Sequence, residues 1–182
     1  MLKVLFLDRD GIINVEKNYL YKIEDFEFIN DTLDLIKKAK ELGYEIIVVS
    51  NQAGIAKGKY TLKDLEINDK WLKEQFLNMG TPLLDTFYCP NHKDGIIEEY
   101  AKDSYDRKPN PGMLLKAKEK YDIDMDNSIM IGDRFSDILA GYNAHVKRLI
   151  LLEADYNYRD FKKEDFPFVK YEIVKSIKEI VI

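Results

Sequence analysis

The sequence predicts an α/β fold of three layers, in which a central parallel, Rossmann-like sheet lies between two layers of helices. Two observations predict it. Apolar runs of about five residues alternate along the chain with segments of helical periodicity, an order typical of parallel sheets covered on both faces. Strands buried on both faces should be continuously apolar, and these runs are.

The amino-terminal part supplies two strands and a helix. Residues 3–7 form a compact apolar run that ends at the polar turn 8–11. Residues 31–42 carry aliphatic side chains on one helical face, with a glycine directly after them. Residues 44–49 form a second apolar run, which ends at the polar pair 50–51.

The middle of the chain continues the alternation. Thr61 is a suitable N-cap for a helix, because it precedes apolar residues at helical spacing. Residues 84–88 are expected to form a third strand. Asn110 and Pro111 open another helix, with the proline at its first position. Residues 128–131 predict a fourth strand.

The last part predicts a helix from about residue 136 and a fifth strand at residues 146–152. The tail carries weaker signals and is expected to cover an edge of the sheet. No repeat or low-complexity linker interrupts the chain, so residues 1–182 are predicted to form a single domain. The intervals between the polar clusters are filled by one helix, one strand and their loops, which leaves no room for a separate cap domain.

Composition bounds the function. Hydrophobic residues make up 46% of the chain and charged residues 34%, which is globular rather than disordered. The net charge of -5 argues against nucleic acid as a partner, because phosphate backbones require a basic face. A single cysteine favours a reducing, cytoplasmic location, and no signal peptide or membrane span is expected. We expect a monomer or weak oligomer.

Polar clusters stand at three predicted strand ends: Asp8 with Asp10, Ser50 with Asn51, and Asp133. In open α/β sheets, ligands bind outside the carboxyl ends of the strands. Two carboxylates in one turn could provide a nucleophile and an acid/base, although solvated aspartates are also common in turns. A hydroxyl at a strand end could bind a phosphoryl oxygen, or could simply cap a turn.

Two further motifs suit phosphate and magnesium. Arg107 and Lys108 precede a helix, and both cations suit a phosphate group, although a solvated basic turn has the same composition. Asp133 could be a hard oxygen ligand for Mg²⁺. Asp137 could orient Lys108 or cap the following helix.

Together these motifs resemble the haloacid dehalogenase superfamily, because DRDG, a serine, a lysine and GDxxxD stand in the expected order over residues of about 4 to 150. The blocks DRDGIIN, SNQAGIAKGKY, CPNH and RKPNPGM are similar to the subfamily of D-glycero-D-manno-heptose 1,7-bisphosphate phosphatases and histidinol-phosphate phosphatases. The resemblance implies the haloacid dehalogenase form of the predicted fold.

The resemblance also implies roles for the polar residues. Asp8 would be the nucleophile and Asp10 the acid/base, while Ser50 and Lys108 would hold the transferring phosphoryl group. Magnesium would be bound by Asp8, the backbone carbonyl of Asp10, and Asp133. Residues in contact with substrate would be Glu16, Lys17, Asn18, Tyr19, Asn51, Gln52, Ala53, Arg107 and Arg134.

One segment departs from the subfamily, which usually carries a structural zinc loop. Cys89 matches the first ligand, but Asn91, Ser104 and Asp106 stand where the others belong, and His92 is one residue displaced. Zinc prefers thiolate and imidazole ligands. We therefore expect no structural zinc, and a loop that either folds on hydrogen bonds or is mobile.

The sequence therefore predicts a magnesium-dependent phosphomonoesterase that acts through an aspartyl phosphate on a small phosphorylated sugar. By resemblance the substrate is a heptose 1,7-bisphosphate, which loses its C7 phosphate on the way to a nucleotide-activated heptose for surface polysaccharide. Histidinol phosphate or another sugar phosphate is an open alternative. A phospho-acceptor signalling domain is another, because such domains also gather acidic residues around magnesium at strand ends.

Overall fold

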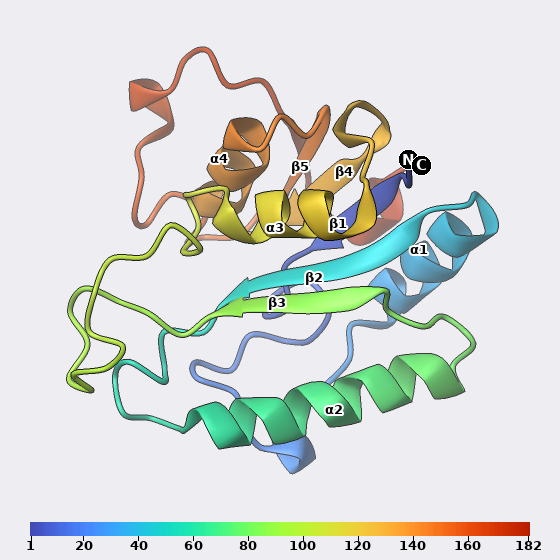
Figure 1. Ribbon diagram of the computed structural model, residues 1–182. Helices are drawn as coiled ribbons and strands as arrows, with labels where there is room; N and C mark the ends of the chain where they lie inside the picture. The colour runs from blue at the N-terminus through green and yellow to red at the C-terminus, as the bar shows by residue number, and fades with distance from the viewer.

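A computed structural model of the protein describes residues 1–182 and contains one six-stranded parallel sheet (Figure 1). The strands are β1 (Val4–Leu7), β2 (Glu45–Asn51), β3 (Asp85–Cys89), β4 (Ile129–Gly132), β5 (Arg148–Leu152) and β6 (Glu172–Val174). The α-helices are α1 (Asn30–Glu41), α2 (Leu62–Asn78), α3 (Gly112–Tyr121) and α4 (Phe135–Asn143). Short 3₁₀ turns lie at Ile23–Asp25, Met125–Asn127, Lys163–Asp165 and Ile177–Glu179.

The strand order is β3-β2-β1-β4-β5-β6. The chain moves outward from β1 in one direction through β2 and β3, and then returns to place β4 on the other side of β1. The order therefore reverses between β1 and β4, and the carboxyl ends of these two strands flank the crevice in which α/β proteins of this type bind ligands. The predicted parallel α/β fold is confirmed.

Helices cover both faces of the sheet, as predicted for continuously apolar strands. Leu5 and Leu7 point to the face where α1 and α2 pack, while Val4 and Phe6 point to the face of α3 and α4. Figure 1 shows α3 and α4 on one side of the sheet and α2 on the other. All four of these β1 side chains are fully buried, so β1 lies at the centre of the core.

Local signals set most element ends correctly. The hydroxyl of Thr61 accepts a hydrogen bond from the backbone of Asp64 (3.2 Å), and the Asp64 carboxylate accepts one from the backbone of Thr61 (2.8 Å). This reciprocal capping confirms the predicted start of α2. The prediction for α3 was wrong by one position: Pro111, with φ -86° and ψ 3°, is the N-cap and Gly112 begins the helix.

The tail does more than cover an edge. Residues Glu172–Val174 pair with β5 in parallel register and add a sixth strand that the sequence did not indicate. Between β5 and β6 the chain runs past α4, and we call residues 154–161 of this connection the tail loop. None of the helices combines the length and apolar character needed to cross a bilayer.

Candidate active site

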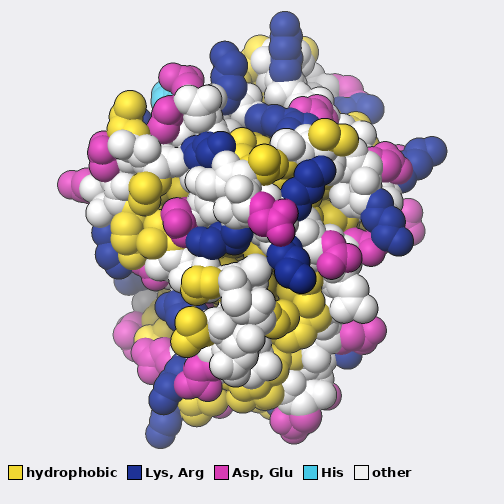
Figure 2. Space-filling model, turned by 90° about the vertical axis from the view of Figure 1, so that its right-hand side faces the viewer, with side chains coloured by type: hydrophobic (Ala, Val, Ile, Leu, Met, Phe, Trp, Pro, Cys, Tyr) yellow, Lys and Arg dark blue, Asp and Glu magenta, His cyan; other side chains and the backbone are white.

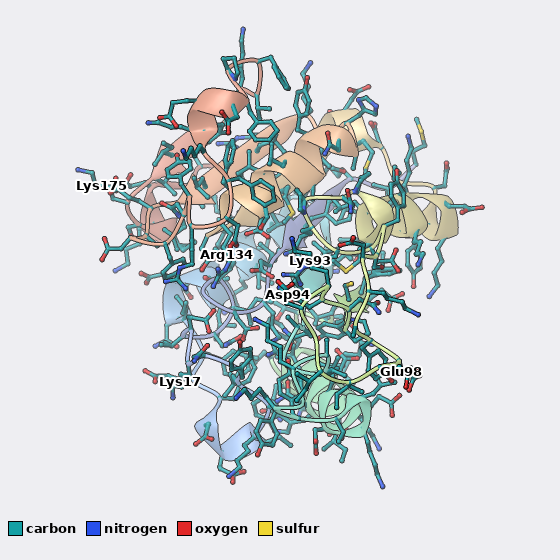
Figure 3. All side chains as sticks on the ribbon, turned by 90° about the vertical axis from the view of Figure 1, so that its left-hand side faces the viewer. Lys17, Lys93, Asp94, Glu98, Arg134 and Lys175 are labelled. Atoms are coloured by element: carbon teal, nitrogen blue, oxygen red, sulfur yellow. The ribbon has the colours of Figure 1, made fainter.

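A polar cavity of about 740 Å³ opens at the carboxyl ends of the strands. Figure 3 looks onto this face, with Arg134, Lys93 and Asp94 near its middle. Only 5 of the 25 residues that line the cavity are hydrophobic, so it suits a hydrophilic ligand. The opposite end of the molecule, seen in Figure 2, carries acidic and basic side chains intermixed rather than a basic stripe.

Asp8, Lys108 and Asp137 form a buried charged triad at the cavity floor. The Lys108 ammonium lies 2.9 Å from Asp8 Oδ1 and 2.6 Å from Asp137 Oδ1. It also donates to the carbonyl of Val49 at 2.7 Å, so all three of its protons have acceptors. Asp137 Oδ2 accepts from the backbone of Arg134 at 2.9 Å. Asp137 therefore orients Lys108 and caps α4 at the same time.

Burial and neighbouring charges raise the pKa values of two carboxyl groups at the site, Asp8 and Asp133. Desolvation raises the pKa of Asp8 to about 7, against the opposing charge of Lys108 and with a further increase from Asp137 and Asp10. Burial, with the charges of Asp8 and Asp137, also raises the pKa of Asp133 well above its usual range. A cation bound beside Asp8 and Asp133 would stabilise the ionised forms of both carboxyl groups.

The residues present fit a divalent cation. Asp8, Asp133 and Asp137 offer carboxylate oxygens that lie within 4.8 Å of one another. Asp133 is fully buried, and its Oδ1 has no hydrogen-bond partner. Both Asp137 oxygens are already engaged, which leaves Asp8 and Asp133 as the better ligands. A buried carboxylate oxygen without a donor is costly unless a cation compensates it.

Asp10 is held by a residue that sequence reasoning missed. The fully buried Arg9 donates to both carboxylate oxygens of Asp10 at 3.1 Å. Asn14 and Gln52 donate to the same carboxylate, each at 2.9 Å. Burial would raise the pKa of Asp10, but the charge of Arg9 and these hydrogen bonds lower it overall. A charged residue between two aspartates normally suggests exposure, so no sequence pattern indicated this buried pairing of Arg9 with Asp10.

The β2 end supplies positioning contacts. The Asn51 side chain accepts from the backbone of Lys108 at 2.9 Å and donates to its carbonyl at 3.0 Å. This paired contact fixes the backbone that carries the lysine. Gln52 donates to the hydroxyl of Ser50 at 3.0 Å and accepts a short hydrogen bond from Tyr60. Ser50, Asn51 and Gln52 all line the cavity.

The structure brings most of the predicted substrate contacts to the cavity wall: Glu16, Asn18, Tyr19, Asn51, Gln52, Ala53, Arg107 and Arg134. Lys17 is the exception. It lies at the edge of the face in Figure 3 and pairs with the carbonyl of Asp25 (2.8 Å) and the carboxylate of Glu27 (3.2 Å). Its predicted substrate contact therefore has no support from its position.

The tail loop contributes residues that the sequence did not indicate. Arg159, Asp160 and Phe161 line the cavity. The Tyr156 hydroxyl donates to Asp133 Oδ2 at 2.7 Å, and Asn157 donates to the Asp133 carbonyl at 2.5 Å. These residues follow the last strand-end motif and belong to no recognisable pattern, so no sequence signal could have found them.

The loop between β3 and α3 is ordered by hydrogen bonds. Cys89 is buried, and its sulfur lies 3.8 Å from Oδ1 of Asn91. The Asn91 carbonyl accepts from Arg107 at 3.3 Å, and Ser104 accepts from the backbone of Asp106 at 3.1 Å. Of the two alternatives predicted for this loop, these contacts favour folding on hydrogen bonds.

Comparisons with known proteins agree with this geometry. The sequence family described as polynucleotide kinase 3 phosphatase matches residues 3–178. The chain is 48% identical over 155 residues to the D-glycero-alpha-D-manno-heptose-1,7-bisphosphate 7-phosphatase of Photorhabdus laumondii, covering 85% of both chains. It is 40% identical over 148 residues to the D-glycero-beta-D-manno-heptose-1,7-bisphosphate 7-phosphatase of Escherichia coli K12, covering 81% of this chain and 78% of the relative.

Solved structures resemble the fold closely. A HAD-like phosphatase from Mesorhizobium loti superposes with a TM-score of 0.79 at 31% identity, over 85% of this chain and 74% of the other. The D,D-heptose 1,7-bisphosphate phosphatase from B. bronchiseptica, complexed with magnesium and phosphate, gives a TM-score of 0.76 at 21% identity, over 97% and 94% of the two chains.

Proposed function

The chain belongs to the haloacid dehalogenase phosphatases, within the family described as polynucleotide kinase 3 phosphatase, and we propose that it is a magnesium-dependent heptose 1,7-bisphosphate 7-phosphatase. The reaction is supported by the carboxylate of Asp8 held 2.9 Å from Lys108 at the β1–β4 switch point. The substrate is supported by the 48% identity to a relative of that name.

In the first step, a carboxylate oxygen of Asp8 attacks phosphorus and forms an acyl phosphate, while the bond from phosphorus to the sugar oxygen breaks. Lys108 and the Ser50 hydroxyl neutralise and bind the phosphoryl oxygens. Asp10 gives its proton to the departing sugar oxygen. Asn51 contributes by fixing the Lys108 backbone in place.

In the second step, Asp10 removes a proton from water, which attacks phosphorus and releases Asp8. The lowered pKa of Asp10 keeps its carboxylate ionised, and therefore free to accept this proton. For the first step Asp10 must carry a proton, which its contact with Arg9 opposes.

Asp8, Asp133 and the backbone carbonyl of Asp10 would hold the magnesium ion. Bound there, it would supply positive charge beside the reacting phosphoryl group and fix its orientation. The unpartnered Asp133 Oδ1 and the raised pKa values of Asp8 and Asp133 support this assignment.

The outer part of the cavity suits the rest of a phosphorylated sugar. Five basic side chains line it: Lys57, Lys93, Arg107, Arg134 and Arg159. Acidic and amide groups at Glu16 and Asn18 offer partners for hydroxyl groups. A polar cavity with several cations away from the nucleophile favours a substrate that carries a second anionic group.

Phosphate release with Mg²⁺ across a small panel tests the proposal. The panel contains both anomers of heptose 1,7-bisphosphate, heptose 1-phosphate, fructose 1,6-bisphosphate and histidinol phosphate. We expect a strong preference for one heptose bisphosphate anomer, with kcat/KM near or above ~10⁴ M⁻¹s⁻¹ and release from C7.

The matched control is Asp8→Asn, which should lose turnover on every substrate. Weak, uniform activity of the wild-type protein across the panel would contradict the heptose assignment. A preference for histidinol phosphate would move the substrate to the other branch of the subfamily.

A further inference from the structure

We propose that Tyr156 of the tail loop is a positioning residue for the metal site, whose hydroxyl fixes the Asp133 carboxylate so that Oδ1 faces the ion. The inference rests on the proposed function, because it concerns the divalent cation that this function requires. The role belongs to the tail loop, a segment that contains none of the polar motifs at the strand ends.

The contact divides the two oxygens of one buried carboxylate. The Tyr156 hydroxyl donates to Oδ2 of Asp133 at 2.7 Å, while Oδ1 of Asp133 has no partner. Without the hydroxyl, both oxygens would lack a donor and the carboxylate could rotate about its last bond. Residues that hold a metal ligand in this way commonly change metal affinity by 10- to 100-fold when they are mutated.

The tail loop also contacts the backbone of Asp133, through the side chain of Asn157. Asn157, which is buried, donates to the carbonyl of Asp133 at 2.5 Å and to that of Leu152 at 2.8 Å. Its own carbonyl accepts from the backbone of Phe135 at 2.8 Å. The neighbouring residues Tyr156 and Asn157 therefore fix the side chain and the main chain of Asp133 from one turn.

Two arginines hold the Tyr156 ring. The guanidinium carbon of Arg134 lies 5.1 Å from the ring centroid and that of Arg159 lies 5.9 Å from it. Such cations are attracted to the face of an aromatic ring. Both arginines also line the cavity, so the contacts of the Tyr156 ring and hydroxyl connect the cavity lining to Asp133.

Gly11 also limits the space around Oδ2 of Asp133. A Cβ at Gly11 would lie 1.9 Å from Asp133 Oδ2 and 3.2 Å from the Tyr156 hydroxyl. Oδ2 of Asp133 therefore lies close to both the Gly11 backbone and the Tyr156 hydroxyl, which leaves this one oxygen little room to move.

The test compares two hydroxyl deletions in one loop. Tyr156→Phe removes the contact to Asp133 and keeps the ring. Tyr158→Phe, the matched control, removes a hydroxyl that is 2.8 Å from the hydroxyl of Tyr171 and does not contact Asp133. Mn²⁺ is titrated into the substrate-free protein, and the electron paramagnetic resonance signal of the free ion measures how much is bound. This gives the metal affinity without any turnover.

We expect Tyr156→Phe to weaken Mn²⁺ binding by about tenfold or more and Tyr158→Phe to leave it within about twofold of wild type. Tyr156→Phe should show a lower kcat than wild type at limiting Mg²⁺ and recover it at saturating Mg²⁺. A general packing defect would lower kcat at both Mg²⁺ concentrations. Thermal unfolding in chelator checks that both variants are folded.

Two outcomes would overturn the inference and are distinguishable. Wild-type affinity in a folded Tyr156→Phe would refute the positioning role and leave the proposed function intact. No Mn²⁺ binding by the wild-type protein would refute the metal site itself, and the inference with it.

Discussion

Replacing Asp8 by asparagine should abolish turnover and also stabilise the metal-free protein. Burial raises the pKa of Asp8 to about 7 from a reference value of 3.8, although Lys108 opposes the shift. At pH 8 the folded protein must therefore carry a buried charge that the unfolded chain carries in water at no cost. The neutral amide removes this cost and can still accept from Lys108.

The sign follows from the direction of the shift. Because the pKa of Asp8 is raised in the fold, its stabilising contribution is complete below about pH 4 and is lost as the pH rises through about 7. A shift of about three units corresponds to roughly 4 kcal/mol at pH 8. This net shift already includes the opposing attraction of Lys108, so we expect Asp8→Asn to gain up to about 4 kcal/mol at pH 8 and clearly less at pH 5.

Urea unfolding in chelator at pH 8 and pH 5 measures both free energies of unfolding. Asp85→Asn serves as the control of opposite sign. Burial would raise the pKa of Asp85, but hydrogen bonds from Lys120, from the backbone of Thr86 and from Tyr121 lower it overall, so its loss should destabilise at pH 8. A less stable Asp8→Asn at pH 8, or a gain that does not change with pH, would refute the reasoning.

Three further predictions concern the residues around Asp8, Asp10 and Asp133. Arg9→Met should lose about 3–5 kcal/mol of unfolding free energy, because it leaves the carboxylate of Asp10 without its buried cation. A loss below about 1 kcal/mol in urea unfolding would contradict a stabilising role for the ion pair between Arg9 and Asp10. Gly11→Ala should lower metal affinity at least about tenfold, since its Cβ would lie 1.9 Å from an Asp133 oxygen at a φ of +87°; unchanged Mn²⁺ binding would contradict this. Mg²⁺ affinity measured by calorimetry should fall about tenfold per pH unit below pH 7, because protons compete for Asp8; a flat profile from pH 5.5 to 8 would argue against Asp8 as a ligand.

The parallel sheet, and the polar residues at the carboxyl ends of its strands, could be predicted from the sequence for a clear physical reason. Apolar runs such as that of β1 can be buried only between two helical layers, and the polar residues that follow them must then meet at one edge. Asp8 and Asp133 are more than 100 positions apart, yet their strands are neighbours. Strand-end polarity is therefore enough to place them together.

The remaining features depend on contacts that carry no local pattern. Arg9 is charged and adjacent to carboxylates, and only the folded chain shows that its guanidinium is fully buried. Tyr156 lies in a connection without periodicity, and its partner is 23 positions away. Strand β6 has three residues, which is too short for an alternation of apolar and polar side chains to be recognised, and two of them are exposed.

Trapping the phosphorylated intermediate would show directly whether Asp8 accepts the phosphoryl group. Asp10→Asn is mixed with heptose 1,7-bisphosphate and Mg²⁺, quenched in acid, reduced with borohydride and examined by peptide mass spectrometry. We predict that the variant accumulates an acyl phosphate, and that reduction alters the residue at Asp8 alone. Phosphate release without any modified aspartate, or modification at another residue, would contradict the covalent mechanism.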